Sequence, residues 1–312
     1  MKIAWFFPGQ GSQSAGMAKD VLESSAAARD VFARVDAALG EPLSRLILEG
    51  PEDELTLTAN AQPAIVATSA AILAALREAL PSLPAPAFAA GHSLGEYSAL
   101  VASGALGLED AVRVVRARGK AMQEAVPKDV GAMAAVMGIE PALVRELCDK
   151  GREGEVVSPA NFNAPGQIVI AGHAGAVARV SALVSEAKGK AIPLKVSAPF
   201  HCALMAPAAR VVERCLAEVK FARPAFPIVA NFDGRPNDDA GRIAALLTKQ
   251  VDGAVQWEDS VRYVADQGVT LALEIGPGKV LSGLVKRIAK TIRVHSVGTA
   301  PAIAETDAFL RS

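Results

Sequence analysis

A chain of 312 residues exceeds the usual size of one compact core, so we expect one large domain with an insertion or two modest domains. A net charge of −1, with no long basic run, argues against a general attraction to nucleic acid or to an anionic membrane. Hydrophobic residues make up 51% of the chain and aromatics only 4%, which favours an α/β protein whose sheet is buried on both faces.

The cysteines and the N-terminal segment indicate a reducing, cytoplasmic compartment. Cys148, Cys202 and Cys215 have neither paired spacing nor an even count, so we expect no disulfide framework and no metal site. The apolar run at residues 3–7 is too short for a signal-peptide core. No apolar run approaches membrane-spanning length, and we therefore expect no membrane contact.

The first part of the chain alternates strands and helices. Residues 3–7 are predicted to form a buried strand, and a glycine-rich loop follows it. Apolar residues at three- and four-residue spacing then predict helices at residues 18–39 and 61–80. A short strand at 87–90 and a helix at 96–103, ended by Gly104, come next, and a further helix is predicted at about 109–125.

The segment 126–198 differs in character from what precedes it. Strands are predicted at 131–137, 156–162, 167–171 and 191–196, and helices at 141–150 and 174–188. This β-α-β-β-α-β order is typical of a ferredoxin-like unit. Later strands at 227–231, 270–275 and 292–297 alternate with helical runs. We therefore predict an α/β fold in which residues 1–125 and 199–312 form a large subdomain with a parallel sheet flanked by helices, and residues 126–198 an inserted small one.

The pentapeptide Gly91-His92-Ser93-Leu94-Gly95 places a serine between two glycines at a predicted strand-to-helix turn. Such a nucleophile elbow needs small residues two positions before and after the serine, because a Cβ there would clash with the tight turn. The pattern also occurs by chance as an ordinary glycine turn. The strand before it and the helix after it favour Ser93 as an attacking nucleophile.

A serine hydroxyl needs a base within hydrogen-bond reach, and histidine is the usual choice. Of the four histidines, His92 lies inside the elbow, His173 at a turn and His295 in a late strand. His201 follows the small unit at a predicted helix start beside the cleft, so we interpret it as the base, with a capping or core role as the alternative and His92 as second candidate. No acid stands out as a third member, and a backbone carbonyl could orient His201 instead.

Arg118 falls on the apolar stripe of the predicted helix 109–125. The stripe comprises Ala111, Val112, Val115, Gly119 and Met122. An inward guanidinium needs an anionic partner, since an unpaired buried charge costs about 3–5 kcal/mol. Arg118 is therefore interpreted as half of an internal salt bridge, as a side chain that extends to the surface, or as a bidentate clamp for a substrate carboxylate.

The loop at residues 7–13 follows the first strand and carries two glycines. It lacks the third glycine of a dinucleotide-binding loop, and no second strand with an acid follows about 20 residues later. We instead predict that the backbone amides of Gln10 and Leu94 form an oxyanion hole.

Together these residues resemble the malonyl-CoA:acyl-carrier-protein transacylase family of type II fatty-acid synthesis, which is related to polyketide synthase acyltransferase domains. The resemblance covers essentially the whole chain. It rests on the segments FPGQGSQ (7–13), GHSLGEY (91–97), RGKAMQ (118–123), NFNAPGQ (161–167), HCALM (201–205) and EIGPG (274–278). The family fold implies a hydrolase-like large subdomain and a ferredoxin-like small one.

The resemblance also implies roles for individual residues. Ser93 would carry the malonyl group as an ester, and His201 would act first as base and then as acid. Arg118 would bind the free carboxylate, and the Gln10 and Leu94 amides would bind the oxyanion.

Two further roles follow from the same resemblance. The main-chain carbonyl of Gln250 would orient His201, and Asn161 would lie near the cleft. The implied partners are malonyl-CoA and an acyl carrier protein, with coenzyme A thioester as substrate and no separate cofactor.

Phe200 departs from the fatty-acid branch of the family, whose members often have a serine immediately before the catalytic histidine. A phenylalanine there is similar to malonyl-selective acyltransferases of polyketide synthases, and its ring would fill the space that a C2 methyl group needs. This keeps a polyketide synthase or malonate decarboxylase pathway open as an alternative.

Two other rival functions remain at this stage, a serine thioesterase or hydrolase and a non-catalytic scaffold. Candidate docking residues for an acidic carrier are basic side chains that could equally be solvated surface charge: Lys188, Lys190, Lys195, Lys286, Arg287 and Lys290.

Overall fold

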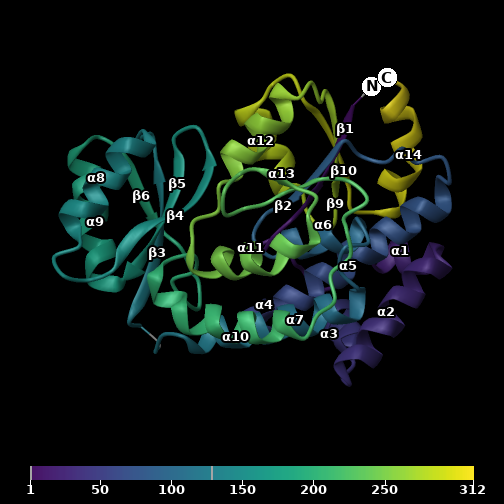
Figure 1. The fold of residues 1–312 in the computed structure, drawn as a ribbon, viewed down its shortest axis with the longest axis horizontal. Coiled ribbons are helices and arrows are strands. Elements are labelled where there is room, and N and C mark those ends of the chain that lie inside the picture. The colour runs from purple at the N-terminus through teal and green to yellow at the C-terminus, as the bar shows by residue number, and fades with distance from the viewer. Residues whose placement is uncertain (1, 128) are drawn as a thin grey trace.

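The computed structural model describes residues 2–127 and 129–312, which form two separate sheets with helices packed around them (Figure 1). Within these residues the larger sheet has six strands in the order β10-β9-β1-β2-β7-β8. The strands are β1 (Ile3–Phe7), β2 (Phe88–Gly91), β7 (Ile228–Val229), β8 (Pro236–Asn237), β9 (Leu271–Ile275) and β10 (Arg293–Val297). All neighbours pair in parallel except β7 and β8, which are antiparallel.

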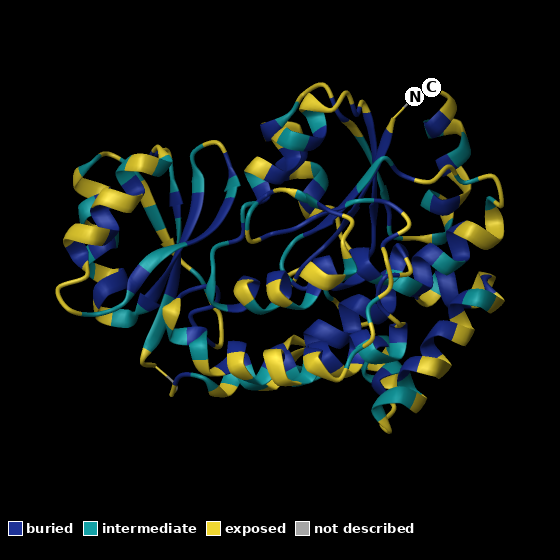
Figure 2. Cartoon of the chain, in the orientation of Figure 1, coloured by how far each residue is buried: buried dark blue, intermediate teal, exposed yellow. Residues whose placement is uncertain are grey.

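The sheet is buried because its central strands are apolar on both faces. Every residue of β1 is buried, and alternate side chains point to opposite layers of helices. Trp5 and Phe7 belong to the large core on one face, whereas Ala4 and Phe6 pack into a second core that contains Trp257. Figure 2 shows this arrangement as buried strands between helices whose outer faces are exposed.

Helices before the small sheet pack mainly on the first of these cores. They are α1 (Lys19–Ser24), α2 (Ala26–Leu39), α3 (Leu43–Glu49), α4 (Glu52–Thr56), α5 (Thr58–Ala79), α6 (Gly95–Ala102) and α7 (Leu108–Glu124). The chain returns to the large sheet with a short 3₁₀ turn (Ala203–Met205), α10 (Ala206–Ala217), α11 (Ala240–Asp252), α12 (Trp257–Asp266), α13 (Val280–Ile288) and α14 (Ala300–Arg311).

Three local predictions need correction. The strand expected at 191–196 ends at Pro193, and a local hydrogen bond from Val196 N to Leu194 O follows it. The helix expected at 18–39 is interrupted at Ser25, whose backbone is extended and whose hydroxyl accepts a hydrogen bond from Ala28 N at 3.1 Å, capping α2. The strand expected at 227–231 shortens to β7, because the chain turns back after Val229 through a hydrogen bond from Gly234 N to Ala230 O.

Helix α5 corrects the expectation that no segment approaches membrane-spanning length. Residues Thr58–Ala79 are long and apolar enough to cross a membrane by length and composition, with a mean hydropathy of 1.4 in the most apolar window. However, 83% of that window is buried inside the protein. The position of α5 in the core, between α2 and α7, explains why it is apolar on all sides (Figure 1).

The smaller sheet is antiparallel and contains, within the described residues, four strands in the order β4-β5-β3-β6. Its elements are β3 (Gly131–Met137), α8 (Pro141–Gly151), β4 (Val157–Ala164), β5 (Gln167–His173), α9 (Ala174–Glu186) and β6 (Lys190–Pro193). Both helices pack on one face of the sheet and share an apolar core with it. The predicted fold class, a parallel sheet flanked by helices with a ferredoxin-like unit inserted, is therefore confirmed.

The two sheets meet beside α12. Asn161 of β4 forms an isolated parallel bridge with Val255, and Phe162 N donates to Val255 O at 2.9 Å. These contacts hold one edge of the small sheet against the connection between α11 and α12. Ligands of open parallel sheets bind outside the carboxyl ends of their strands, and the candidate site lies at this junction.

Candidate active site

Ser93 sits at the sharp turn between β2 and α6. Its φ of 51° lies in the left-handed region, a strained conformation for a residue with a Cβ. A Cβ at Gly91 would lie 1.9 Å from the carbonyl carbon of Gly95, and a Cβ at Gly95 would lie 2.2 Å from Phe7 O. The glycine spacing is thus a steric requirement of the turn.

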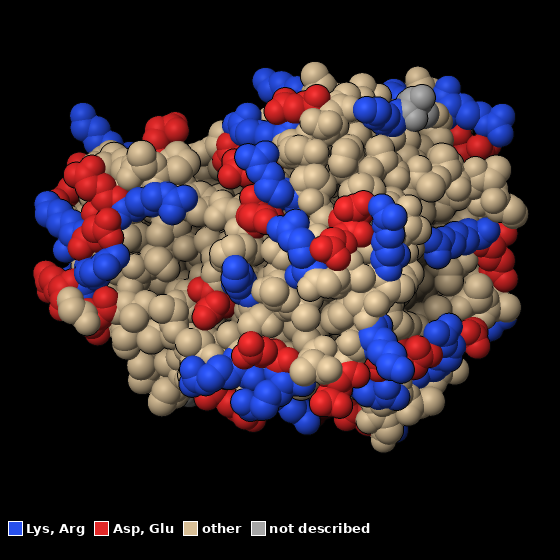
Figure 3. Space-filling model, in the orientation of Figure 1, with Lys and Arg blue, Asp and Glu red and all other residues tan. Residues whose placement is uncertain are grey.

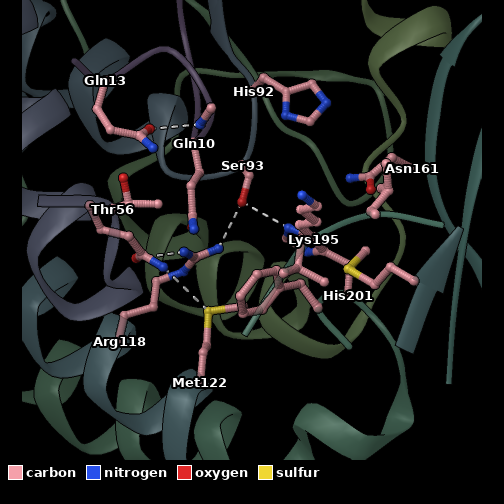
Figure 4. Close-up of a pocket in the computed structure, with 16 residues that line it drawn as sticks. Gln10, Gln13, Thr56, His92, Ser93, Arg118, Met122, Asn161, Lys195 and His201 are labelled. Carbon is pink, nitrogen blue, oxygen red and sulfur yellow. Dashed lines mark hydrogen bonds between the residues drawn. The ribbon is translucent and has the colours of Figure 1, made fainter. Parts of the chain in front are cut away.

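A histidine lies against the serine hydroxyl. His201 Nε2 is 2.8 Å from Ser93 Oγ (Figure 4). His201 Nδ1 is 2.8 Å from the main-chain oxygen of Gln250. A carbonyl oxygen can only accept, so Nδ1 carries the proton and Nε2 accepts from the serine hydroxyl. Gln250 therefore takes, through its backbone, the place that a carboxylate has in a triad.

The imidazole is held neutral by its surroundings. His201 is 4% exposed, and burial together with the nearby positive charge of Arg118 lowers the pKa of His201 to about 3. A ring that stays unprotonated at neutral pH is available as a base. Its backbone φ of 59° is also left-handed, so both members of the pair are held by strained backbone.

Arg118 lies inside the site, as the apolar stripe predicts. The stripe residues of α7 are buried with it, and the arginine itself is 1% exposed. Its Nη2 donates to Ser93 Oγ at 3.0 Å and to Gln250 Oε1 at 2.9 Å, and its Nη1 donates to Gln62 Oε1 at 2.7 Å. Burial lowers the pKa of Arg118.

The partners of this guanidinium are all neutral. No carboxylate of residues 2–127 or 129–312 lies within 4.0 Å of the Arg118 nitrogens, and its buried Nε has no partner there. The internal salt bridge considered from the sequence is therefore absent from the described structure. A buried guanidinium without a carboxylate can pair with an anionic ligand.

Two backbone amides remain free beside the serine. Among the hydrogen bonds of the described residues, none uses the amide of Gln10 or that of Leu94. The amide of Ser93, in contrast, donates to Asn231 Oδ1 at 2.6 Å and is not free for an oxyanion. The Gln10 side chain turns away from this role and donates to Thr58 Oγ1 at 3.2 Å.

A cavity of about 240 Å³ is lined by Gln10, Ser93, Arg118 and His201. Asn161 and Phe200 lie on its wall with Lys195, and both Asn161 and Phe200 are largely buried (Figure 4). Its apolar surface is contributed by Met122, Met133, Leu194, Val196 and Phe200. The cavity thus joins a nucleophile, a cation and an apolar wall.

The other histidines are engaged elsewhere. His92 Nε2 donates to Asn163 Oδ1 at 2.8 Å. His173 Nδ1 accepts from Val156 N, and His295 Nε2 donates to Ala302 O. Over residues 2–127 and 129–312, no group of three His, Cys, Asp or Glu side chains could hold a metal ion, and the three cysteines are free.

Three polar residues of the site were missed by the sequence analysis: Gln62, Glu96 and Asn231. Each is buried: Gln62 accepts from Arg118, Asn231 accepts from Ser93 N, and Glu96 accepts from Asn231 and Gln250. Glu96 follows Ser93 by three residues, and its position inside the GHSLGEY segment was the only available signal.

The family is decided by comparison with known proteins. The acyl transferase domain model matches residues 4–309. The chain belongs to the acyl transferase family. A relative from Escherichia coli strain K12, named malonyl CoA-acyl carrier protein transacylase, is 46% identical over 304 residues that cover 97% of this chain and 98% of the relative.

Solved structures of acyl transferases agree with this assignment. The acyl-carrier-protein S-malonyltransferase of Bartonella henselae is 45% identical, with all of both chains covered and a TM-score of 0.96. A malonyl-transacylase in complex with a type II polyketide synthase acyl-carrier protein is 42% identical, with 98% of each chain covered and a TM-score of 0.93.

Proposed function

We propose that this acyl transferase moves a malonyl group from coenzyme A to the phosphopantetheine thiol of an acyl carrier protein, through an ester on Ser93. One observation carries the proposal: the Ser93 hydroxyl lies 2.8 Å from the His201 imidazole and 3.0 Å from a buried guanidinium that has no carboxylate partner among the described residues. The nucleophile matches acyl transfer, and the cation matches an acyl group with a free carboxylate.

In the first half-reaction Ser93 Oγ attacks the thioester carbonyl carbon while His201 Nε2 takes the hydroxyl proton. The oxygen that becomes negative is stabilised by the amides of Gln10 and Leu94, each worth about 10²–10³-fold in rate. The carbon–sulfur bond then breaks, and His201 returns the proton to the departing coenzyme A thiolate. The product is the malonyl ester of Ser93.

The second half-reaction reverses these steps with another thiol. The carrier thiol gives its proton to His201 and attacks the ester carbon, and the proton passes to Ser93 Oγ as the carbon–oxygen bond breaks. Water competes at the same ester. The partly enclosed cavity favours the thiol because the pantetheine arm fills it.

Arg118 selects the acyl group. In a malonyl ester two carbon atoms lie between Ser93 Oγ and the carboxylate carbon, a reach that suits a guanidinium whose Nη2 is 3.0 Å from Oγ. The planar fork can bind both carboxylate oxygens, whereas an acetyl group would leave the buried charge unpaired. Phe200 on the cavity wall is proposed to restrict a C2 methyl group.

We propose fatty-acid synthesis as the pathway and the cytoplasm as the location. The exposed basic side chains proposed to meet an acidic carrier flank the cavity and the small sheet, and Arg287 also donates to Pro165 O at the β4–β5 turn. Charges of both signs are interspersed over the face shown in Figure 3, so docking would depend on such local groups. We also propose that residues 1–125 and 199–312 form one subdomain and that residues 126–198 form a second.

A polyketide synthase carrier is the second candidate, favoured by Phe200 and by the 42% identity to the transacylase bound to such a carrier. A thioesterase is disfavoured by the inward guanidinium. No separate cofactor is proposed, since serine, histidine and arginine account for each step.

The test is to trap the acyl-enzyme. Wild-type protein is incubated with malonyl-, methylmalonyl- or acetyl-CoA, and the mass added at Ser93 is measured before and after holo carrier proteins from fatty-acid and polyketide systems are added. We expect a malonyl adduct that the correct carrier removes, and no adduct on Ser93→Ala. Rapid release of coenzyme A without any thiol acceptor would instead identify a hydrolase.

A further inference from the structure

Glu96 is a buried carboxyl group behind the nucleophile that the proposed chemistry does not use. It lies in the first turn of α6 and is 3% exposed. Burial raises the pKa of Glu96 to about 7, and hydrogen bonds from Asn231 and Gln250 act in the opposite direction. Burial of a carboxyl group costs free energy unless the group is hydrogen-bonded or paired, so the two hydrogen-bond partners of Glu96 are informative.

The first partner is Asn231, which holds the elbow. Asn231 N donates to Glu96 Oε2 at 3.0 Å. Its side chain spans the turn, accepting from Ser93 N at 2.6 Å and donating to Gly91 O at 2.6 Å. Glu96 thereby fixes the residue that bridges the strained backbone on both sides of Ser93.

The second partner is Gln250, whose amide can be satisfied in one orientation only. Its Oε1 accepts from Arg118 Nη2 at 2.9 Å, and its Nε2 donates to Ser93 O at 2.9 Å and to Glu96 Oε2 at 2.8 Å. A guanidinium can only donate, while a carbonyl and a carboxylate accept. A flipped amide would lose all three hydrogen bonds.

Gln250 serves the site through its main chain as well. The same residue whose side chain meets Arg118 presents its carbonyl to His201 Nδ1 at 2.8 Å. A shift of the Gln250 backbone would therefore move the acceptor of the base and carry the side chain that meets the guanidinium with it. The Glu96 carboxylate accepts from the same side-chain amide and so helps to hold Gln250 in place.

We propose that Glu96 is a positioning residue: through Gln250 and Asn231 its carboxylate keeps the Ser93 turn, the His201 ring and the Arg118 guanidinium in one fixed arrangement. This inference rests on the proposed function, because it concerns the same site. Glu96 touches none of the reacting atoms and acts only through its two partners.

The experiment compares Glu96→Ala, which removes the acceptor, with Glu96→Gln, which keeps an acceptor oxygen. Two rate constants are measured per folded molecule: labelling of Ser93 by a fluorophosphonate, and acylation at saturating malonyl-CoA. We expect Glu96→Ala to slow both by about 10- to 100-fold, and Glu96→Gln to restore most of the labelling rate. Labelling of folded Glu96→Ala within about twofold of wild type would overturn the proposal.

Loss of stability alone must be separated from loss of position. Glu274 is the matched control, since it is another fully buried carboxylate that accepts two backbone hydrogen bonds, from Leu281 N at 2.9 Å and Ser282 N at 2.8 Å. Glu274→Ala should lower the melting temperature and leave the labelling rate of the folded fraction unchanged. A similar slowing in this control would also count against a specific role for Glu96.

Two further outcomes of the experiment can also be interpreted. If Glu96→Ala does not fold, Glu96→Asp is measured instead, because it keeps the charge but withdraws the carboxylate oxygens by about 1.5 Å. We expect labelling of Glu96→Asp to be at least about tenfold slower than that of wild type, and a wild-type rate would overturn the proposal. If wild-type protein reacts with the fluorophosphonate but forms no malonyl ester, the proposed function fails, and the labelling rates still judge Glu96.

Discussion

Replacing Arg118 by alanine tests the choice of acyl group most directly. The guanidinium is 1% exposed and bonds only to the neutral groups of Gln62, Ser93 and Gln250 among the described residues. A malonyl carboxylate would provide its ionic partner, and loss of one member of such a desolvated pair costs about 3–4 kcal/mol. This corresponds to about 10²- to 10³-fold in kcat/KM for malonyl-CoA.

Acetyl transfer should respond differently to the same change. An acetyl ester makes no contact with the guanidinium fork, so we expect kcat/KM for acetyl-CoA in Arg118→Ala to stay within about tenfold of wild type. The ratio of malonyl to acetyl transfer should therefore fall by at least about tenfold. It is measured with both thioesters, one holo carrier protein and matched enzyme concentrations.

A second readout comes from the base. The positive charge of Arg118 lowers the pKa of His201, so its removal should raise that pKa and move the acid limb of acetyl transfer to higher pH. Arg116→Ala is the control, because Arg116 lies on the same helix but bonds to Ala59 O at 2.9 Å, outside the cavity. An unchanged malonyl-to-acetyl ratio in folded Arg118→Ala would refute the assignment of the carboxylate site.

Three further changes have separate expected outcomes. Phe200→Ala should raise methylmalonyl relative to malonyl acylation by about 5- to 100-fold, equivalent to about 1–3 kcal/mol. The ratio is measured by mass spectrometry with the two thioesters in competition. An unchanged ratio would show that Phe200 does not restrict a C2 methyl group. Gly95→Ala should abolish acylation and lower the melting temperature, because its Cβ would meet Phe7 O; normal activity would contradict the steric argument. Between about pH 6.5 and 3 the unfolded chain binds a proton at His201 that the native protein does not, so the free energy of unfolding falls as the pH falls. His201→Gln lacks this proton-binding group, so from pH 7 to 4.5 its free energy of unfolding in urea should fall by on the order of 2 kcal/mol less than that of wild type. Parallel pH profiles of the two proteins would refute this.

Features that depend on local sterics were predictable from the sequence. The elbow needs glycine at 91 and 95 because of clashes within and next to the turn, and such requirements leave a short motif. Arg118 was placed inward because a helix presents one stripe to the core, and the stripe residues around it are buried. The β-α-β-β-α-β order was likewise readable from periodicity.

The hydrogen-bond network behind the site was not predictable in this way. Asn231 and Gln250 are separated from Ser93 by 138 and 157 residues, and only the packing of the sheet brings them together. Glu96 resembles an ordinary acid in the first turn of a helix, where such residues usually face solvent. It is buried because α6 begins beneath the ends of the strands, a fact of tertiary structure.

The use of a backbone carbonyl behind His201 has a physical reason in the proposed mechanism. A carboxylate at the position of Gln250 O would lie beside both the imidazole and a guanidinium that bonds to the side chain of the same residue. It would pair with Arg118 and occupy the charge that a malonyl carboxylate needs. A neutral carbonyl fixes the tautomer of His201 without that competition. The nearby carboxyl, Glu96, is instead separated from the guanidinium by the Gln250 amide, so the site keeps an acid for positioning while its arginine stays available to substrate.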